Sequence, residues 1–300
     1  MKYYLNLFSK SLLNTIIKVS SHSFFLLLLI VISINGNLCQ IKFRKLNYQT
    51  IIIIEINETG RQKIISQYYP NPSKVYINEE MQSQISTDNI YDLNENKNTI
   101  KMIWDNPLTY FKSMFNECSK IVSIVFISLV TSSNVNNMEA MFYGCSSLIS
   151  LDLSNMETSS ITSMENMFQG CSSLKSINFN NFNTNYVNNM KSMFYGCSSL
   201  ISLDLSSFNT QKVINMKKMF YNCKSLIGLD LSNFKIENIT SLNNMFCNCI
   251  SLKLLDLTNF NANKVTNMSY MFSGCSSLVS LNLMNNIENV KYMNIISFFY

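Results

Sequence analysis

The sequence is almost without histidine: the 300-residue chain holds one, His22, inside an N-terminal apolar segment. Ser-His-Asp and Cys-His catalytic sites and histidine-based zinc sites all need an imidazole, so the chain after that segment has none of them. Its seven glycines stand singly, which excludes a glycine-rich phosphate loop. We therefore expect no catalytic residue, no metal and no cofactor, and a protein that is not an enzyme.

Charge is also scarce, at 14% of residues with a net charge of +5. Residues 1–37 carry Lys2, Lys10 and Lys18 and no acid, so the rest of the chain holds 20 basic and 18 acidic residues, a net charge of +2. Such a weak charge, without a basic stripe, argues against a nucleic-acid partner. Proline and glycine number only 3 and 7, and with the low charge this predicts a folded chain rather than a disordered one.

The three N-terminal lysines precede an apolar run at 24–34 and small polar residues at 35–37. This arrangement is typical of a secretory signal peptide over residues 1–37, and the run is shorter than the roughly 20 residues of a membrane-spanning helix. An uncleaved signal anchor that reaches back to Leu12 is the alternative. Either way we expect a secreted or cell-surface protein that meets the membrane only through this segment.

The dominant feature of the chain is an internal repeat. The fourteen residues 141–154, MFYGCSSLISLDLS, return letter for letter at 193–206. Met-Phe pairs keep one phase through seven copies, 27 residues apart once and 26 thereafter, and they begin at Met114, Met141, Met167, Met193, Met219, Met245 and Met271. A fixed period of this length indicates stacked repeats, each of which buries its apolar residues against its neighbours.

Each copy contains a strand pattern. Leu148, Leu151 and Leu153 form L-x-x-L-x-L, with Asp152 between the last two, and the same columns return in later copies. Alternation with a period of two predicts a short strand with one buried face.

A helix pattern precedes that strand. Apolar residues from Val135 to Cys145 fall at near-helical spacing, with Asn137 placed as an N-cap. Gly144 stands before the cysteine, and glycine or asparagine occupies this position in the later copies. Both residue types readily take the left-handed conformation that ends a helix, so we expect a helix of about one and a half turns in each copy.

Residues 38–103 precede the repeats and lack their signature. Apolar and β-branched stretches predict strands at 51–56, 61–67, 74–78 and 99–104, the first two as a hairpin around Gly60, with loops between them. We interpret this region as a β-rich N-terminal cap, because a stack of repeats needs its end covered. An independent ligand-binding domain is the alternative.

The repeats occupy residues 104–290, and residues 291–300 form a C-terminal tail. This tail is apolar, and no polar capping segment follows the last copy. An uncovered strand edge offers unpaired N–H and C=O groups, so we expect the chain to self-associate through this end.

A cysteine follows each repeated Met-Phe pair at a constant distance. The seven cysteines are Cys118, Cys145, Cys171, Cys197, Cys223, Cys249 and Cys275. A single column does not converge on a tetrahedral metal site, and stacked copies point their Cβ atoms in parallel, which disfavours the alternative of disulfides. We expect a structural ladder of buried thiols.

A polar column accompanies the buried leucines. It consists of Asp152, Asn178, Asp204, Asp230, Asp256 and Asn282. Its neighbours along each strand face inward, so this column must face solvent. It is either a solvated stripe that keeps the sheet soluble or a recognition stripe that meets a ligand or Ca²⁺. The columns beside it offer serines and no further acids, which favours the solvated stripe.

The unit M-x-x-M-F-x-x-C-x-S-L-x-x-L-D-L-S-x-F resembles the 26-residue repeat of BspA-like leucine-rich-repeat surface proteins, from Trp104 to about Val290. The resemblance implies an exported, non-enzymatic cell-surface protein used in adhesion or recognition.

We therefore predict an α/β repeat solenoid, a leucine-rich-repeat-like stack of short parallel strands and short helices with a small β-rich N-terminal cap. The expected partner is an unknown protein or glycan on another cell or in the matrix. The alternative is a structural coat protein that assembles end to end through its uncapped C-terminal repeat.

Overall fold

The computed structural model describes residues 49–129, 131 and 135–292, which all lie in the compact unit Gln49–Tyr300. The predicted signal segment 1–37 and residues 293–300 of the predicted tail lie outside the described residues. Within the described ranges, no helix is long and apolar enough to cross a membrane.

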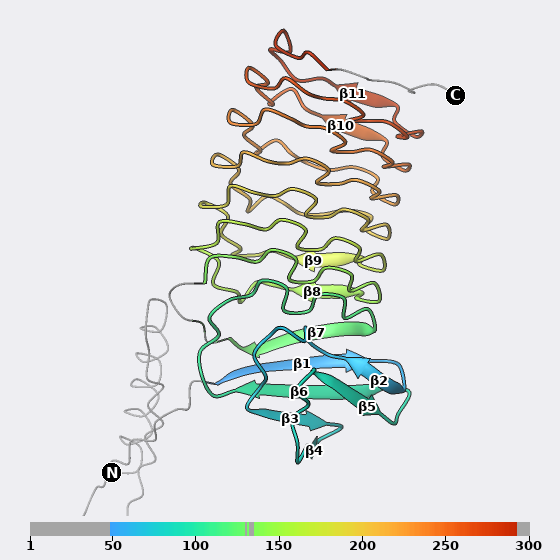
Figure 1. Ribbon diagram of the computed structural model, residues 1–300. Helices are drawn as coiled ribbons and strands as arrows, with labels where there is room; N and C mark the ends of the chain where they lie inside the picture. The colour runs from blue at the N-terminus through green and yellow to red at the C-terminus, as the bar shows by residue number, and fades with distance from the viewer. Residues whose placement is uncertain (1–48, 130, 132–134, 293–300) are drawn as a thin grey trace, which may run out of the picture. The chain divides into compact units, whose positions relative to one another are not determined.

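The predicted α/β repeat solenoid with short helices is wrong. The described residues form strands and turns but no helix, and the main sheet is a mixed one of seven strands in the order β4-β3-β6-β1-β7-β8-β9 (Figure 1). Two further sheets have two strands each, β10-β11 and β2-β5. The strands are β1 (Thr50–Ile56), β2 (Gly60–Lys63), β3 (Lys74–Ile77), β4 (Glu80–Met81), β5 (Ile90–Leu93), β6 (Asn98–Trp104), β7 (Ile121–Ser128), β8 (Ser150–Asp152), β9 (Ser176–Asn178), β10 (Leu254–Asp256) and β11 (Ser280–Asn282).

The N-terminal half of the main sheet is organised around β1. Its isoleucines alternate, so that Ile52, Ile54 and Ile56 are fully buried while the residues between them are partly exposed. The strands predicted at 51–56, 74–78 and 99–104 are present as β1, β3 and β6. The predicted hairpin around Gly60 is wrong, because both edges of β1 are already paired, with β6 and β7, and β2 pairs with β5 instead.

Strand β7 connects this region to the repeats. It pairs antiparallel with β1 along one edge and parallel with β8 along the other, and β8 pairs parallel with β9. Ile124, Leu151 and Ile177 are register partners across β7, β8 and β9, and all three are buried. One continuous apolar layer therefore passes from the cap region into the 26-residue copies.

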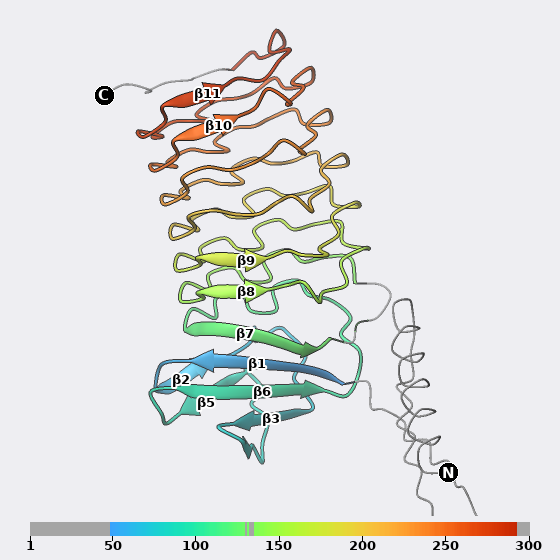
Figure 2. The ribbon, with the colours of Figure 1, turned by 180° about the vertical axis from the view of Figure 1, so that it is seen from behind.

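Successive copies lie one above another as coils made mainly of turns, as Figures 1 and 2 show from opposite sides. Parallel bridges join each copy to the same position in the next, as in Asn137 to Ser163, Ser163 to Asn189 and Asn189 to Asn215. Each of these coils therefore takes 26 residues, and this length places every residue beside its counterpart in the next copy.

Left-handed residues explain why the Met-Phe segments form turns and not helices. Ala140 has φ 53° and Gly144 has φ 70°, and later copies repeat both positive values. A right-handed helix cannot continue through two left-handed residues four positions apart. The freed amides bond to the next coil instead: Ala140 N donates to Glu165 O at 2.9 Å and Gly144 N donates to Gln169 O at 2.7 Å.

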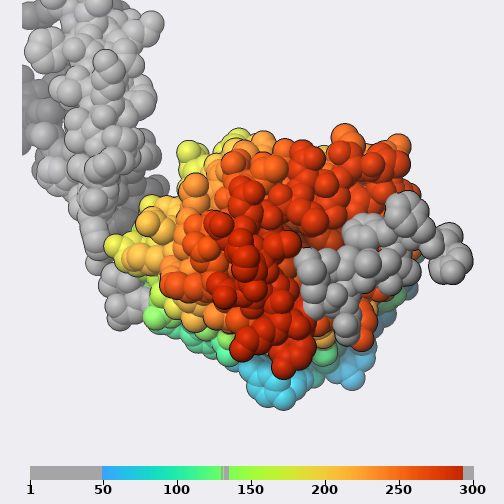
Figure 3. All heavy atoms as spheres, turned by 90° about the horizontal axis from the view of Figure 1, so that it is seen from above, coloured from blue at the N-terminus to red at the C-terminus, as the bar shows by residue number. Residues whose placement is uncertain are grey.

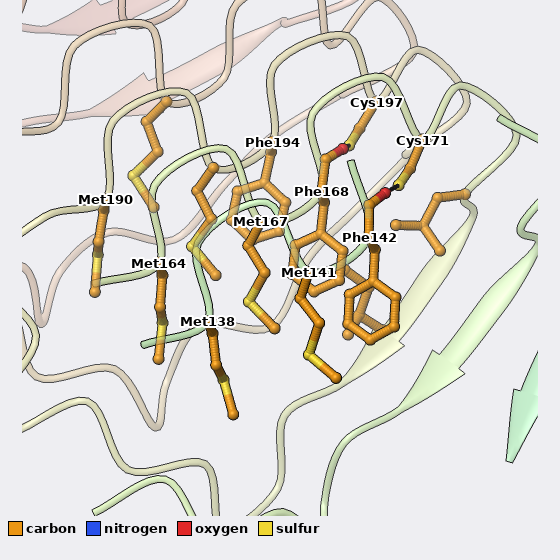
Figure 4. Close-up of a cluster of buried hydrophobic side chains, with 14 of the residues drawn as sticks. Met138, Met141, Phe142, Met164, Met167, Phe168, Cys171, Met190, Phe194 and Cys197 are labelled. Carbon is orange, nitrogen blue, oxygen red and sulfur yellow. Dashed lines mark hydrogen bonds between the residues drawn. The ribbon is translucent and has the colours of Figure 1, made fainter. Parts of the chain in front are cut away.

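The core between the coils consists of side-chain columns. Phenylalanine rings from seven consecutive copies stack nearly parallel, with centroids 5.4–5.8 Å apart and interplanar angles of 3–6°. Figure 4 shows this column between columns of methionine and cysteine, and the end view in Figure 3 shows the last coils filled by side chains. Each copy thus buries the same residues against the copies above and below.

Candidate functional site

The candidate site is the outward side of β7, β8, β9 and the equivalent segments of the later coils, which we call the strand face. Three neighbouring columns make up its repeat portion. The polar column is the predicted stripe, made up of Asp152, Asn178, Asp204, Asp230, Asp256 and Asn282. The serine column lies two residues earlier in each copy and consists of Ser150, Ser176, Ser202, Gly228, Leu254 and Ser280. The apolar column lies one residue before that and consists of Ile149, Lys175, Ile201, Ile227, Lys253 and Val279. All of the polar column is exposed except Asn178, which is half-buried.

The polar column ends each strand segment with a side-chain turn. Asp152 Oδ1 accepts a hydrogen bond from Ser154 N at 2.9 Å, and Asp204 and Asp256 accept the same bond from the residue two positions on, also at 2.9 Å. Such a bond from an aspartate to the backbone two residues later stabilises a turn. The D-x-S/T spacing carries this signal in the sequence, and the sequence prediction missed it.

These hydrogen bonds also keep the aspartates ionised. Bonds from Ser154 lower the pKa of Asp152, and the bond from the Ser206 backbone lowers the pKa of Asp204. Charge accumulates along the column where Asp204, Asp230 and Asp256 follow one another. However, no group of three or more metal-ligating residues occurs in the part of the chain that the structure describes, so the geometry gives no support for a Ca²⁺ site here.

Large apolar side chains are exposed beside this charge. Ile201 is 51% exposed and Val279 is 81% exposed, and β7 continues the same side with Val125 and Ile127. Apolar side chains gathered on an exposed face are typical of interaction surfaces rather than of a solvated one.

The face is hollowed where the serine column is interrupted. Gly228 and Leu254 replace serine there, and they line an open groove of about 600 Å³ together with Asp230, Asp256 and Asn282. Asn282 Nδ2 donates to Asp256 Oδ2 at 3.0 Å, which links the polar column across two coils. The groove therefore offers carboxylates, an amide and apolar walls to a ligand.

The predicted cysteine ladder lies on the inner side of the coils. All seven thiols are free and buried, in one column behind the phenylalanines. Each of the last six donates to the backbone carbonyl of the phenylalanine in the preceding copy, as in Cys171 Sγ to Phe142 O at 3.0 Å and Cys197 Sγ to Phe168 O at 3.2 Å (Figure 4). Cysteine at this position therefore fills apolar space and also satisfies a buried carbonyl.

Burial makes these thiols unreactive. It raises the pKa of Cys118, Cys223 and Cys275 to about 12 and that of Cys197 well above its ordinary value. Nucleophilic and metal-binding cysteines need the thiolate, which these surroundings disfavour. The column is therefore suited to packing, and the chemistry available to a partner lies on the strand face.

One protein family matches the repeats. The profile described as "Mycoplasma protein of unknown function, DUF285" matches residues 109–227 and 200–299, which is more than half of the chain. Comparison with curated proteins gives no match, and comparison with solved structures gives none either. The kinship with BspA-like proteins is not among these findings and stays a prediction. The chain belongs to the family described as Mycoplasma protein of unknown function, DUF285.

Proposed function

We propose that the protein is a non-enzymatic recognition protein of the cell surface, which binds a protein or glycan on another cell or in the matrix through its strand face. The observation that carries the proposal is the exposure of Ile149, Ile201, Ile227 and Val279 beside an ionised polar column. A solvated stripe that only kept the sheet soluble would not need large apolar side chains at 46–81% exposure.

The geometry of the face suits an extended partner. The polar column recurs at every coil, and the apolar column carries a large apolar side chain at four of its six positions, with Lys175 and Lys253 at the other two. A ligand that spans several coils therefore meets similar groups repeatedly, and many weak contacts add up. The resemblance of the repeat unit to that of BspA-like surface proteins supports the same function, as does the signal-like segment at 1–37.

The test uses the full chain on a printed array of matrix proteins and glycans. The Ile201→Asp/Ile227→Asp variant places charge in the apolar column, and Ile214→Asp is its matched control. Ile214 is an isoleucine of similar exposure, 59% against 51% for Ile201, and lies thirteen residues farther along the chain, outside the strand face. We expect at least one array member to bind the native chain and the control, and to bind the double variant at least about tenfold more weakly.

Equal binding by all three proteins would contradict the proposal. The alternative function, an end-to-end coat, places its contacts at the C-terminal repeat, which is predicted to be uncapped and in which β11 is the last strand of the described residues. Sedimentation separates the two functions: particles that grow with protein concentration while no array member binds would favour the coat.

A further inference from the structure

A second concave site lies away from the strand face, where the segment after β2 meets the start of the repeats. It is an open pocket of about 390 Å³, which we call the tyrosine pocket, and its lining includes Tyr68, Tyr69, Tyr110, Lys112, Asn116 and Asn137. This volume falls within the range of about 300–1,000 Å³ that is usual for small-molecule sites. Ser66 N donates to Met114 O at 2.8 Å and fixes the junction that forms the pocket.

Three tyrosines supply the aromatic part of the pocket. Tyr69 is buried, and its hydroxyl donates to Tyr110 O at 2.7 Å. The rings of Tyr69 and Tyr110 meet edge to face with centroids 5.1 Å apart, which holds both in place. Tyr68 lies at the rim and is 82% exposed, a large aromatic side chain that the fold itself leaves uncovered.

Polar groups supply the rest. Lys112 Nζ pairs with Glu139 Oε2 at 3.0 Å, so the ammonium is held beside the pocket with its charge compensated. Asn137 Oδ1 accepts a hydrogen bond from Glu139 N at 2.7 Å, which fixes the amide, and the Asn137 NH₂ makes no hydrogen bond to a residue that the structure describes. The side-chain amide of Asn116 makes no hydrogen bond to any residue that the structure describes, although Asn116 is only partly exposed.

We propose that the tyrosine pocket binds a neutral sugar ring. A pyranose has an apolar face of C–H groups and a rim of hydroxyls, so it needs an exposed aromatic ring and nearby amide or ammonium groups together. Tyr68 and Tyr110 provide the first, and Asn116, Asn137 and Lys112 provide the second. A quaternary ammonium ligand also favours aromatic rings, but its cationic head has no hydroxyl groups to bond with the amides of Asn116 and Asn137. An anion would gain little binding energy from Lys112, because Glu139 already neutralises that ammonium group.

The inference adds a second binding site and does not depend on the strand face. The pocket lies at the cap end, whereas the variants Ile201→Asp and Ile227→Asp lie in later coils, so these variants should bind sugar as the native chain does. Loss of strand-face binding with sugar binding intact, or the reverse, therefore separates the two proposals.

Saturation-transfer NMR on the full chain tests the site, with the methyl glycosides of glucose, galactose, mannose and N-acetylglucosamine as probes and choline chloride as a competing cation. We expect at least one glycoside to bind, and Tyr68→Ala and Asn116→Ala to weaken it at least about tenfold. Tyr186→Ala is the matched control, because Tyr186 is 56% exposed and lies in the repeats outside the pocket.

Thermal melts establish that the variants fold. Sugar binding that is lost in the two pocket variants and kept in the control supports the site. The proposal is overturned if no glycoside binds at tens of millimolar, if folded pocket variants bind like the native chain, or if choline binds and the sugars do not.

Discussion

Alkaline pH is a selective probe of the buried thiols. Burial raises the pKa of Cys223 in the folded protein from an ordinary value of 9.0 to about 12. The folded pKa is thus the higher one, so the stabilisation is complete below about pH 9 and is lost as the pH rises toward 12.

The size of the effect follows from this gap. At about pH 10.5 most thiols of the unfolded chain are ionised while the folded chain keeps Cys223 protonated, which lowers the free energy of unfolding by roughly 2 kcal/mol for this thiol. Cys118 and Cys275 share the value of about 12, and burial raises the pKa of the other thiols in the column as well, so their effects on the free energy of unfolding have the same sign. A typical domain has about 5–15 kcal/mol of stability in total, so we expect the protein to lose much of its stability between about pH 9 and 12.

Guanidinium unfolding at a series of pH values measures this slope, and Trp104, which is buried and is the single tryptophan of the chain, reports on the fold. Cys223→Ala loses the bond to Phe194 O and is destabilised at every pH. Its slope above pH 9 should be shallower than that of the native chain by one proton, about 1.4 kcal/mol per pH unit. Both proteins carry the same tyrosines and lysines, so the ionisation of these residues contributes equally to the two slopes. Equal slopes for the variant and the native chain would therefore refute the burial of the Cys223 thiol.

Three further substitutions test the packing and the backbone. Leu203→Ala should lower the free energy of unfolding by about 2–5 kcal/mol, and Asp204→Ala, one residue away on the exposed side, by much less; the reverse order in denaturant titrations would mean a wrong strand register. Phe194→Ala should lower the free energy of unfolding by about 3–5 kcal/mol, because it opens a ring-sized gap between two stacked neighbours, and Phe194→Leu should lower it by less than half of that. Similar melting temperatures for the alanine variant and the native chain would argue against the stack. Gly170 has φ 78°, so Gly170→Ala should lower the free energy of unfolding by about 1–2 kcal/mol. Gly170→Asn should lower it less, because Asn222 occupies the same column at φ 59°. An alanine variant more stable than the native chain would contradict the left-handed backbone.

The repeat was predictable from the sequence, and so was the inward set of residues. A period of 26 residues held over seven copies requires equivalent environments, so columns such as Met141 and Phe142 had to be buried together. The helix was not excluded by any local signal. Ala140, Ser192 and Lys218 take positive φ, although such residues rarely do, because the coil above and the coil below supply hydrogen bonds that a helix would have made internally.

Of the two candidate sites, the polar column could be predicted from the sequence and the tyrosine pocket could not. The polar column was visible because its period matches that of the leucines on the other side of the strand. The tyrosine pocket was not, because Tyr68 and Tyr110 are 42 residues apart and their segments meet through non-local contacts such as the bond from Ser66 N to Met114 O. The pairing of β2 with β5 was missed for the same reason: non-local strand pairing leaves little local trace.

One side of each coil buries the cysteines, and the other side exposes the strand face. Maleimide labelling of the full-length Ser202→Cys variant, followed by peptide mass spectrometry, tests both halves at once, because Ser202 is exposed and Cys197, five residues earlier, is buried. We predict rapid labelling at position 202 and none at Cys197 until denaturant is added. Rapid native labelling of Cys197, a disulfide between Cys197 and a neighbouring copy, or protection of position 202 would contradict this two-sided arrangement of the coils.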